Sequence, residues 1–162
     1  MVGDGPLRGE LESLARRLGV SGQIEMCGWL TQEELLPLYR RAWALVAPSV
    51  ELANGRQDGI PNVVVEAMAM QLPCVGTRAA GLEEVIVHGE TGLLCDPGDP
   101  EALADVLQEL LAEPGRSDRM GARARARVLE EFDTERSFER FLALFGGVTA
   151  EGEMHGTGTD RR

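Results

Sequence analysis

Apolar residues along the chain alternate between helical spacing and short continuous runs. Helical spacing predicts amphipathic helices over residues 6–19, 31–42, 61–70, 99–112, 117–131 and 134–145. Short apolar or β-branched runs predict strands in VGDGP, QIEMCG, WALVAPS, PCVGT and TGLLCD. The first helix carries its leucines on one face, and the last segment of the chain is Gly-rich with little to bury.

Alternating strands and helices predict an α/β fold of the Rossmann-like kind, with a mostly parallel sheet and helices on both faces. Ligands in such folds bind outside the carboxyl ends of the strands. The run from Gln57 to Thr77 follows the predicted strand WALVAPS and leads into a helix. We therefore expect a ligand at this run.

Two carboxylates, Asp58 and Glu66, mark the same run. Glu66 stands in an apolar stretch that has no other charge until Arg78. An unpaired buried carboxylate costs several kcal/mol, so Glu66 should reach solvent or accept hydrogen bonds from hydroxyls. A ribose diol would supply two such donors, and a purely structural or solvated carboxylate is the alternative. With Pro61 as the first helical residue, Glu66 falls near the second turn, behind a helix N-terminus that suits an anionic group.

Composition narrows the class of partner. The chain has 162 residues, of which 43% are hydrophobic, and a formal net charge of −11. This acidity argues against a nucleic-acid partner. No run approaches the roughly 20 apolar residues of a membrane span, and no motif suggests a metal. The three cysteines fit buried residues in a reducing compartment, so we expect a cytoplasmic protein.

Five segments, in order, resemble the C-terminal domain of the family 4 retaining glycosyltransferases, the glycosyl transferases group 1, which have the GT-B fold. They are VGDGP, IEMCGWLTQEELLPLYRRAWALVAPS, DGIPNVVVEAMAMQLPCVGT, GLEEVIVHGETGLLCDPGDPEALADVL and MGARARARVLEEF. The third segment is similar to the E-x7-E region of that family, with Asp58 in place of its first Glu. Gln71 stands where the family has Gly, and a left-handed backbone there would cost Gln up to about 1 kcal/mol.

The resemblance implies roles for particular residues. Glu66 would bind the ribose of a sugar nucleotide, and Asp58 would contact the donor sugar. The backbone amides of Gly59, Ile60 and Asn62 would face the diphosphate or the sugar.

The resemblance also points to the nucleotide end of the site. Gly3 or Gly5 would line the nucleotide, although the same residues also fit an ordinary turn. Trp29 and Leu30 would pack near the base, and a half-buried surface anchor is the alternative for Trp29. His88 lies in a predicted turn and is expected at the surface.

The implied function is the donor-binding portion of a retaining, hexosyltransferase-type enzyme of carbohydrate biosynthesis. Its donor would be a UDP- or GDP-linked sugar, with no cofactor and no metal. The acceptor, a glycan or a lipid, would bind through an N-terminal domain outside this chain, and the parent protein would associate peripherally with a membrane. A sugar-nucleotide epimerase of GT-B-like fold and a non-catalytic nucleotide-binding or interaction module are the alternatives.

The resemblance further implies an N-terminally truncated domain over residues 1–145, followed by a disordered tail over residues 146–162. The first strand-helix unit of the family, with an Arg and a Lys that grip the diphosphate, would precede VGDGP. The fragment alone should then be inactive. It should also fold poorly, because VGDGP and WALVAPS would lose the central strand that both pair with.

Overall fold

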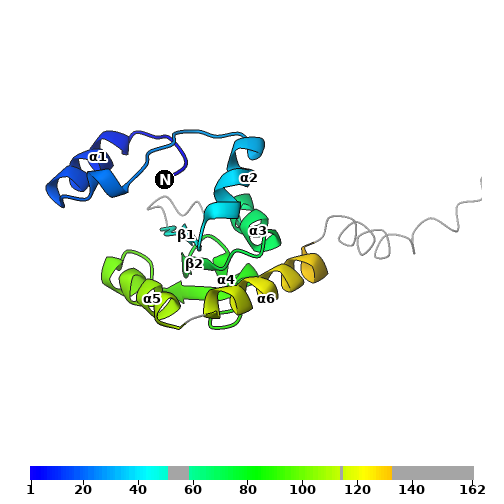
Figure 1. The fold of residues 1–162 in the computed structure, drawn as a ribbon. Coiled ribbons are helices and arrows are strands. Elements are labelled where there is room, and N and C mark those ends of the chain that lie inside the picture. The colour runs from blue at the N-terminus through cyan, green and yellow to red at the C-terminus, as the bar shows by residue number, and fades with distance from the viewer. Residues whose placement is uncertain (51–58, 114, 133–162) are drawn as a thin grey trace, which may run out of the picture.

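The computed structural model describes residues 1–50, 59–113 and 115–132 (Figure 1). In chain order the elements are α1 (Arg8–Arg17), the 3-10 turn η1 (Ser21–Gln23), α2 (Gln32–Arg41), β1 (Leu45–Ala47), α3 (Asn62–Ala69), β2 (Cys74–Thr77), α4 (Leu82–Val85), β3 (Gly92–Cys95), α5 (Pro100–Ala112) and α6 (Arg116–Glu131).

The sheet consists of β1, β2 and β3 in that order, and both pairs of neighbouring strands are parallel. Val75 of β2 lies between Val46 of β1 and Leu93 of β3. Parallel neighbours require crossover connections, which α3 and α4 with their flanking loops provide. This arrangement confirms the predicted α/β fold with a parallel sheet.

Helices cover both faces of this sheet because side chains alternate along each strand. Cys74 and Leu94 belong to a core cluster with α3 and α6. Val75 and Leu93, one position along, belong to a second cluster with α5. The alternation of the two clusters confirms the expected helices on opposite faces.

Two helix starts follow the sequence signals closely. Thr31 and Glu34 form the complete capping box at the start of α2, with Thr31 N–H donating to Glu34 Oε2 over 2.8 Å. Asp99 caps α5 by accepting from the N–H groups of the next turn. The predicted start of α3 was wrong by one residue. Pro61 has an extended ψ of 124° and is the N-cap, so the helix begins at Asn62.

The predicted strands VGDGP and QIEMCG do not form regular strands. Within the described residues they pair only with each other, over a few positions. Cys27 N–H donates to Met1 O over 2.9 Å, and Gly3 N–H donates to Gly28 O over 2.7 Å. These contacts amount to isolated bridges and not to a ladder. The leucine face of α1 remains exposed, at Leu7, Leu11, Leu14 and Leu18.

A close backbone contact joins the end of α3 to α6. Gln71 has a φ of 62°, so the left-handed conformation that the sequence left open at this position is present. Its carbonyl lies against Gly121 of α6, where a Cβ would come within 1.9 Å of Gln71 O. Only glycine therefore lets α6 approach α3 this closely.

The predicted helix over residues 134–145 and the predicted tail over residues 146–162 lie outside the described residues.

Gly121→Ala should lower the free energy of unfolding by roughly 2–3 kcal/mol, because the methyl group would overlap a carbonyl that cannot rotate away. Gly9→Ala is the matched control. Gly9 is also helical, but a Cβ there would meet nothing within 4 Å. It should stabilise the protein by up to about 1 kcal/mol. Urea unfolding followed by circular dichroism measures both changes. Equal stabilities of the two variants would contradict the close contact.

Cys74 should make stability depend on pH in the alkaline range. Burial raises the pKa of the Cys74 thiol to about 12, whereas an unfolded thiol titrates near 8.5. The native state therefore holds a proton that the unfolded state releases. The stabilisation is complete below about pH 8.5 and is lost as pH rises toward 12, with a slope of at most about 1.4 kcal/mol per pH unit.

Denaturant unfolding between pH 8 and pH 11 measures this slope. Cys74→Ala should reduce it, and Cys27→Ala, at a half-buried position outside the core clusters, is the control. Identical slopes in wild type and Cys74→Ala would rule out the contribution of Cys74.

Candidate functional site

Glu66 is the fifth residue of α3, and its half-buried side chain meets helix α2. Tyr39 Oη donates a hydrogen bond to Glu66 Oε2 over 3.1 Å. Gln32 Nε2 lies 3.5 Å from the other oxygen, Oε1. Gln32 and Tyr39 are seven positions apart, which places them on the same face of α2. A hydroxyl donor was expected for Glu66, and on one oxygen the protein supplies it itself.

Tyr39 is a rigid partner for this carboxylate. Its side chain is 7% exposed and belongs to the core cluster around Val64 and Met68. The hydroxyl also lies 3.5 Å from Val63 O. Burial, and then the hydrogen bond and the charge of Glu66, raise the pKa of the Tyr39 hydroxyl. The hydroxyl therefore stays protonated and continues to donate throughout the physiological range.

The segment that leads into α3 presents backbone N–H groups. Gly59 and Asn62 are exposed and Ile60 is half-buried. The N-cap residue, Pro61, makes no side-chain capping hydrogen bond. The first N–H groups of a helix have no intrahelical acceptor, and they carry partial positive charge. Asp58, the other predicted carboxylate, lies outside the described residues.

Glu66 lies about one helical turn from these N–H groups, or roughly 6 Å along the axis. Side chains on a helix lean toward its N-terminus, so the carboxylate leans toward the same end. The arrangement offers a hydrogen-bond acceptor and an anion-binding turn side by side.

A second loop packs against this entry to α3. Ala80 and Gly81, which follow β2, both have left-handed backbones, with φ values of 53° and 70°. A Cβ at Gly81 would come within 3.2 Å of Ile60 Cγ1. Gly81 begins the fourth segment that resembles the family, so the start of that segment contacts the predicted diphosphate segment.

Trp29 and Leu30, which are predicted to lie near the base, stand between two residues that contact other parts of the predicted site. Gly28 bonds Gly3, and Gln32, four residues later, reaches Glu66. Between them, Leu30 is half-buried and Trp29 is 77% exposed, so Trp29 is not a half-buried anchor. An exposed indole ring is free to pack against a ligand.

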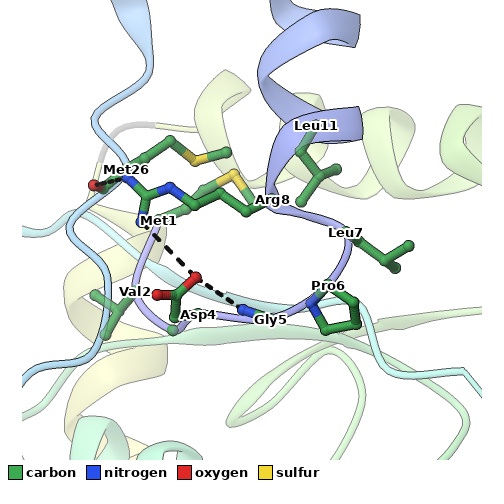
Figure 2. A pocket seen from close by; sticks show the side chains of 10 residues that line it. Met1, Val2, Asp4, Gly5, Pro6, Leu7, Arg8, Leu11 and Met26 are labelled. Atoms are coloured by element: carbon green, nitrogen blue, oxygen red, sulfur yellow. Dashed lines mark hydrogen bonds and ion pairs between the residues drawn. The ribbon is translucent and has the colours of Figure 1, made fainter.

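Gly3 and Gly5 lie on a turn beside a cavity of about 330 Å³, which is formed by the first turn of α1, the residues before it and Met26 (Figure 2). The N–H of Gly5 donates to Asp4 Oδ1 over 2.9 Å, and that of Gly3 is bonded to Gly28. Arg8 lies beside the cavity and donates to Glu12 and to Met26 O. Because both glycine amides are engaged, contact of Gly3 or Gly5 with a nucleotide stays a prediction.

Sequence reasoning missed Tyr39 and Gln32, because it placed Glu66 only within its own helix. The available signal was modest. The chain has a single tyrosine, and it lies on the face of α2 that begins with Gln32.

Two further features bear on the chemistry. His88 is exposed, as expected. Its Nδ1 accepts a hydrogen bond from Leu94 N–H over 3.0 Å, which connects the turn before β3 to that strand. Among residues 1–50, 59–113 and 115–132, no three His, Cys, Asp or Glu side chains gather as potential metal ligands. None of the helices in these ranges is long and apolar enough to cross a membrane.

The family model described as glycosyl transferases group 1 matches residues 1–113 of the chain. The chain belongs to this family. The match spans every predicted site residue, from Gly3 to Glu66, and confirms the resemblance found in the sequence.

Individual relatives and solved structures agree with this assignment. The chain is 32% identical to N-acetyl-alpha-D-glucosaminyl L-malate synthase of Bacillus anthracis over 148 residues, which cover 91% of the chain and 37% of that protein. Sucrose-phosphate synthase from Thermosynechococcus elongatus superposes with a TM-score of 0.75 at 28% identity, over 90% of this chain and 38% of that one.

HepE from Anabaena, solved in complex with UDP, superposes with a TM-score of 0.78 at 23% identity, over 91% of this chain and 40% of that one. At this identity the likeness shows the shared fold. The chain thus spans well under half the length of each of these three proteins.

Proposed function

We propose that this chain binds the nucleotide-sugar donor of a retaining glycosyltransferase. The single observation that carries the proposal is the Glu66 carboxylate, held through Oε2 by Tyr39, about one turn from the N-terminus of α3, where the N-cap residue Pro61 makes no side-chain capping hydrogen bond. Family membership supports the reaction class, which is transfer of a sugar to an acceptor. The proposed donor is a hexose linked to UDP or GDP.

Glu66 binds the ribose in this proposal. An ionised carboxylate accepts up to about four hydrogen bonds, and Tyr39 satisfies one site on Oε2. On Oε1, the described residues supply only the long contact with Gln32. The two hydroxyls of a ribose would fill the remaining sites with charge-assisted hydrogen bonds, which are stronger than those between neutral groups.

The diphosphate lies at the N-terminus of α3, against the amides of Gly59, Ile60 and Asn62. These N–H groups and the positive end of the helix favour an anion without a basic side chain. When the bond from the sugar to the diphosphate breaks, the leaving group gains negative charge. The same groups would then stabilise the transition state more than the bound donor, which is what catalysis requires.

Asp58 contacts the donor sugar, and Trp29 and Leu30 pack against the base. The exposed ring of Trp29 supports this placement. HepE, a protein of the same fold, was solved in complex with UDP, which supports a nucleotide donor in general. Gly3 or Gly5 would complete the nucleotide end of the site.

Acceptor binding and sugar transfer would require the complete protein. A glycan or lipid acceptor would bind to a region outside residues 1–145, in a cytoplasmic enzyme that associates peripherally with a membrane. The donor portion alone would be inactive.

Glu66→Ala should weaken binding of the preferred nucleotide, UDP or GDP, at least roughly tenfold in the full-length protein. Losing hydrogen bonds to a charged group typically costs about 1.5–3 kcal/mol. Titration calorimetry measures the affinity, with circular dichroism as a check on folding. Glu130→Ala, which removes an exposed carboxylate from α6, is the control and should change nothing. Unchanged affinity in a folded Glu66→Ala protein would contradict the assignment of Glu66 as the ribose ligand.

Asp58→Asn should lower turnover of the full-length enzyme while leaving UDP or GDP affinity nearly constant, because the proposed contact is to the sugar. Steady-state kinetics with the sugar nucleotide, beside calorimetry with the nucleoside diphosphate alone, separates the two effects. An equal loss in both measurements would mean that Asp58 shapes the start of α3 instead.

A further inference from the structure

We propose that Tyr39 is a positioning residue for ribose recognition: its hydroxyl fixes the Glu66 carboxylate so that Oε1 faces the nucleotide. This inference rests on the proposed role of Glu66 as the ribose ligand. It adds a residue on another helix, 27 positions earlier in the chain, that never touches the nucleotide itself.

The need for such a residue follows from the flexibility of glutamate. A free Glu side chain samples several rotamers, and fixing it costs up to about 2 kcal/mol. If that cost falls at the moment of binding, it weakens the affinity for the ligand. A hydrogen bond of 3.1 Å from a buried hydroxyl fixes the carboxylate beforehand.

Tyr39 suits this task because it is itself fixed. Its ring is packed in the core cluster that includes α3 and α6, so the hydroxyl cannot follow a moving carboxylate. The tyrosine ring has few rotatable bonds and stays in place at little cost. The position of the hydroxyl therefore sets the position of Oε2.

The two oxygens of Glu66 have different surroundings. Oε2 accepts from the buried Tyr39, whereas Oε1 meets the exposed side chain of Gln32 over 3.5 Å. A contact of that length is weak and easily exchanged. A ribose hydroxyl can replace Gln32 at Oε1 without disturbing Tyr39.

The competing explanation is structural: Glu66 would merely satisfy a buried hydroxyl. Both explanations predict some loss of stability in Tyr39→Phe, since a buried hydrogen bond disappears. Only the positioning role predicts that the loss of affinity depends on the ribose hydroxyls.

The test compares UDP with 2′,3′-dideoxy-UDP, and GDP with its dideoxy analogue, by calorimetry on the full-length protein. Tyr39→Phe should weaken the preferred nucleotide about fivefold to tenfold. It should leave the dideoxy analogue within about twofold of wild type. Ser117→Ala is the matched control, because it removes another partly buried hydroxyl that donates to a carbonyl, Trp43 O. It should change neither affinity.

The outcomes separate this inference from the proposed function. The preference for ribose is the ratio of the affinity for the nucleotide to that for its dideoxy analogue. If Glu66→Ala abolishes this preference but Tyr39→Phe keeps it, Tyr39 does not position the carboxylate and the proposed function stands. If Tyr39→Phe weakens both nucleotides equally, its role is structural and the inference is overturned. If wild type shows no preference for ribose, or Glu66→Ala leaves that preference intact, the proposed ribose contact fails and the inference fails with it.

A crystal structure of Tyr39→Phe without nucleotide gives a readout that needs no binding. The Glu66 carboxylate should leave its position or occupy several. A carboxylate that stays in place in the variant would overturn the positioning role, whatever the affinities show.

Discussion

The hydrogen bond between Tyr39 and Glu66 ties together the parts of this domain that form the site. Glu66 brings a carboxylate into an otherwise apolar helix, and such a group must be partnered when it is withdrawn from water. Its partner is on α2, so this hydrogen bond connects α2 to α3. Helix α3 in turn packs on the sheet and on α6. This hydrogen bond thereby links α2, and the turn with Trp29 and Leu30 that precedes it, to the core.

The fold followed from sequence where local signals and core packing agree. The runs PCVGT and TGLLCD became β2 and β3 because both are fully buried between helices. The capping box at Thr31 needed only residues within one turn. VGDGP and QIEMCG failed as strands because a strand also needs a long partner, and the described residues offer each only a few paired positions.

In the candidate site too, features set by neighbouring residues could be predicted and contacts between distant residues could not. That Glu66 would need hydroxyl donors followed from its apolar neighbours in sequence. The sequence did not show that Tyr39 would be one of these donors, because the contact joins two helices and depends on how both pack in the core. Gln71 shows the same limit. A left-handed backbone at Gln71 could be considered from sequence, because the related family has Gly there, but the glycine that lies against its carbonyl, Gly121, is 50 positions away on α6.

An acidic chain that binds a diphosphate has to keep its own carboxylates away from the phosphates. In the proposed site, the order of groups along α3 does this. The neutral N–H groups at the helix N-terminus take the anion, and Glu66 lies about one turn further along, where it accepts from hydroxyls. A ribose placed between them puts the uncharged part of the nucleotide against the carboxylate. In that proposed arrangement, the hydrogen bond from Tyr39 would both direct Glu66 toward the ribose and hold its charge away from the diphosphate.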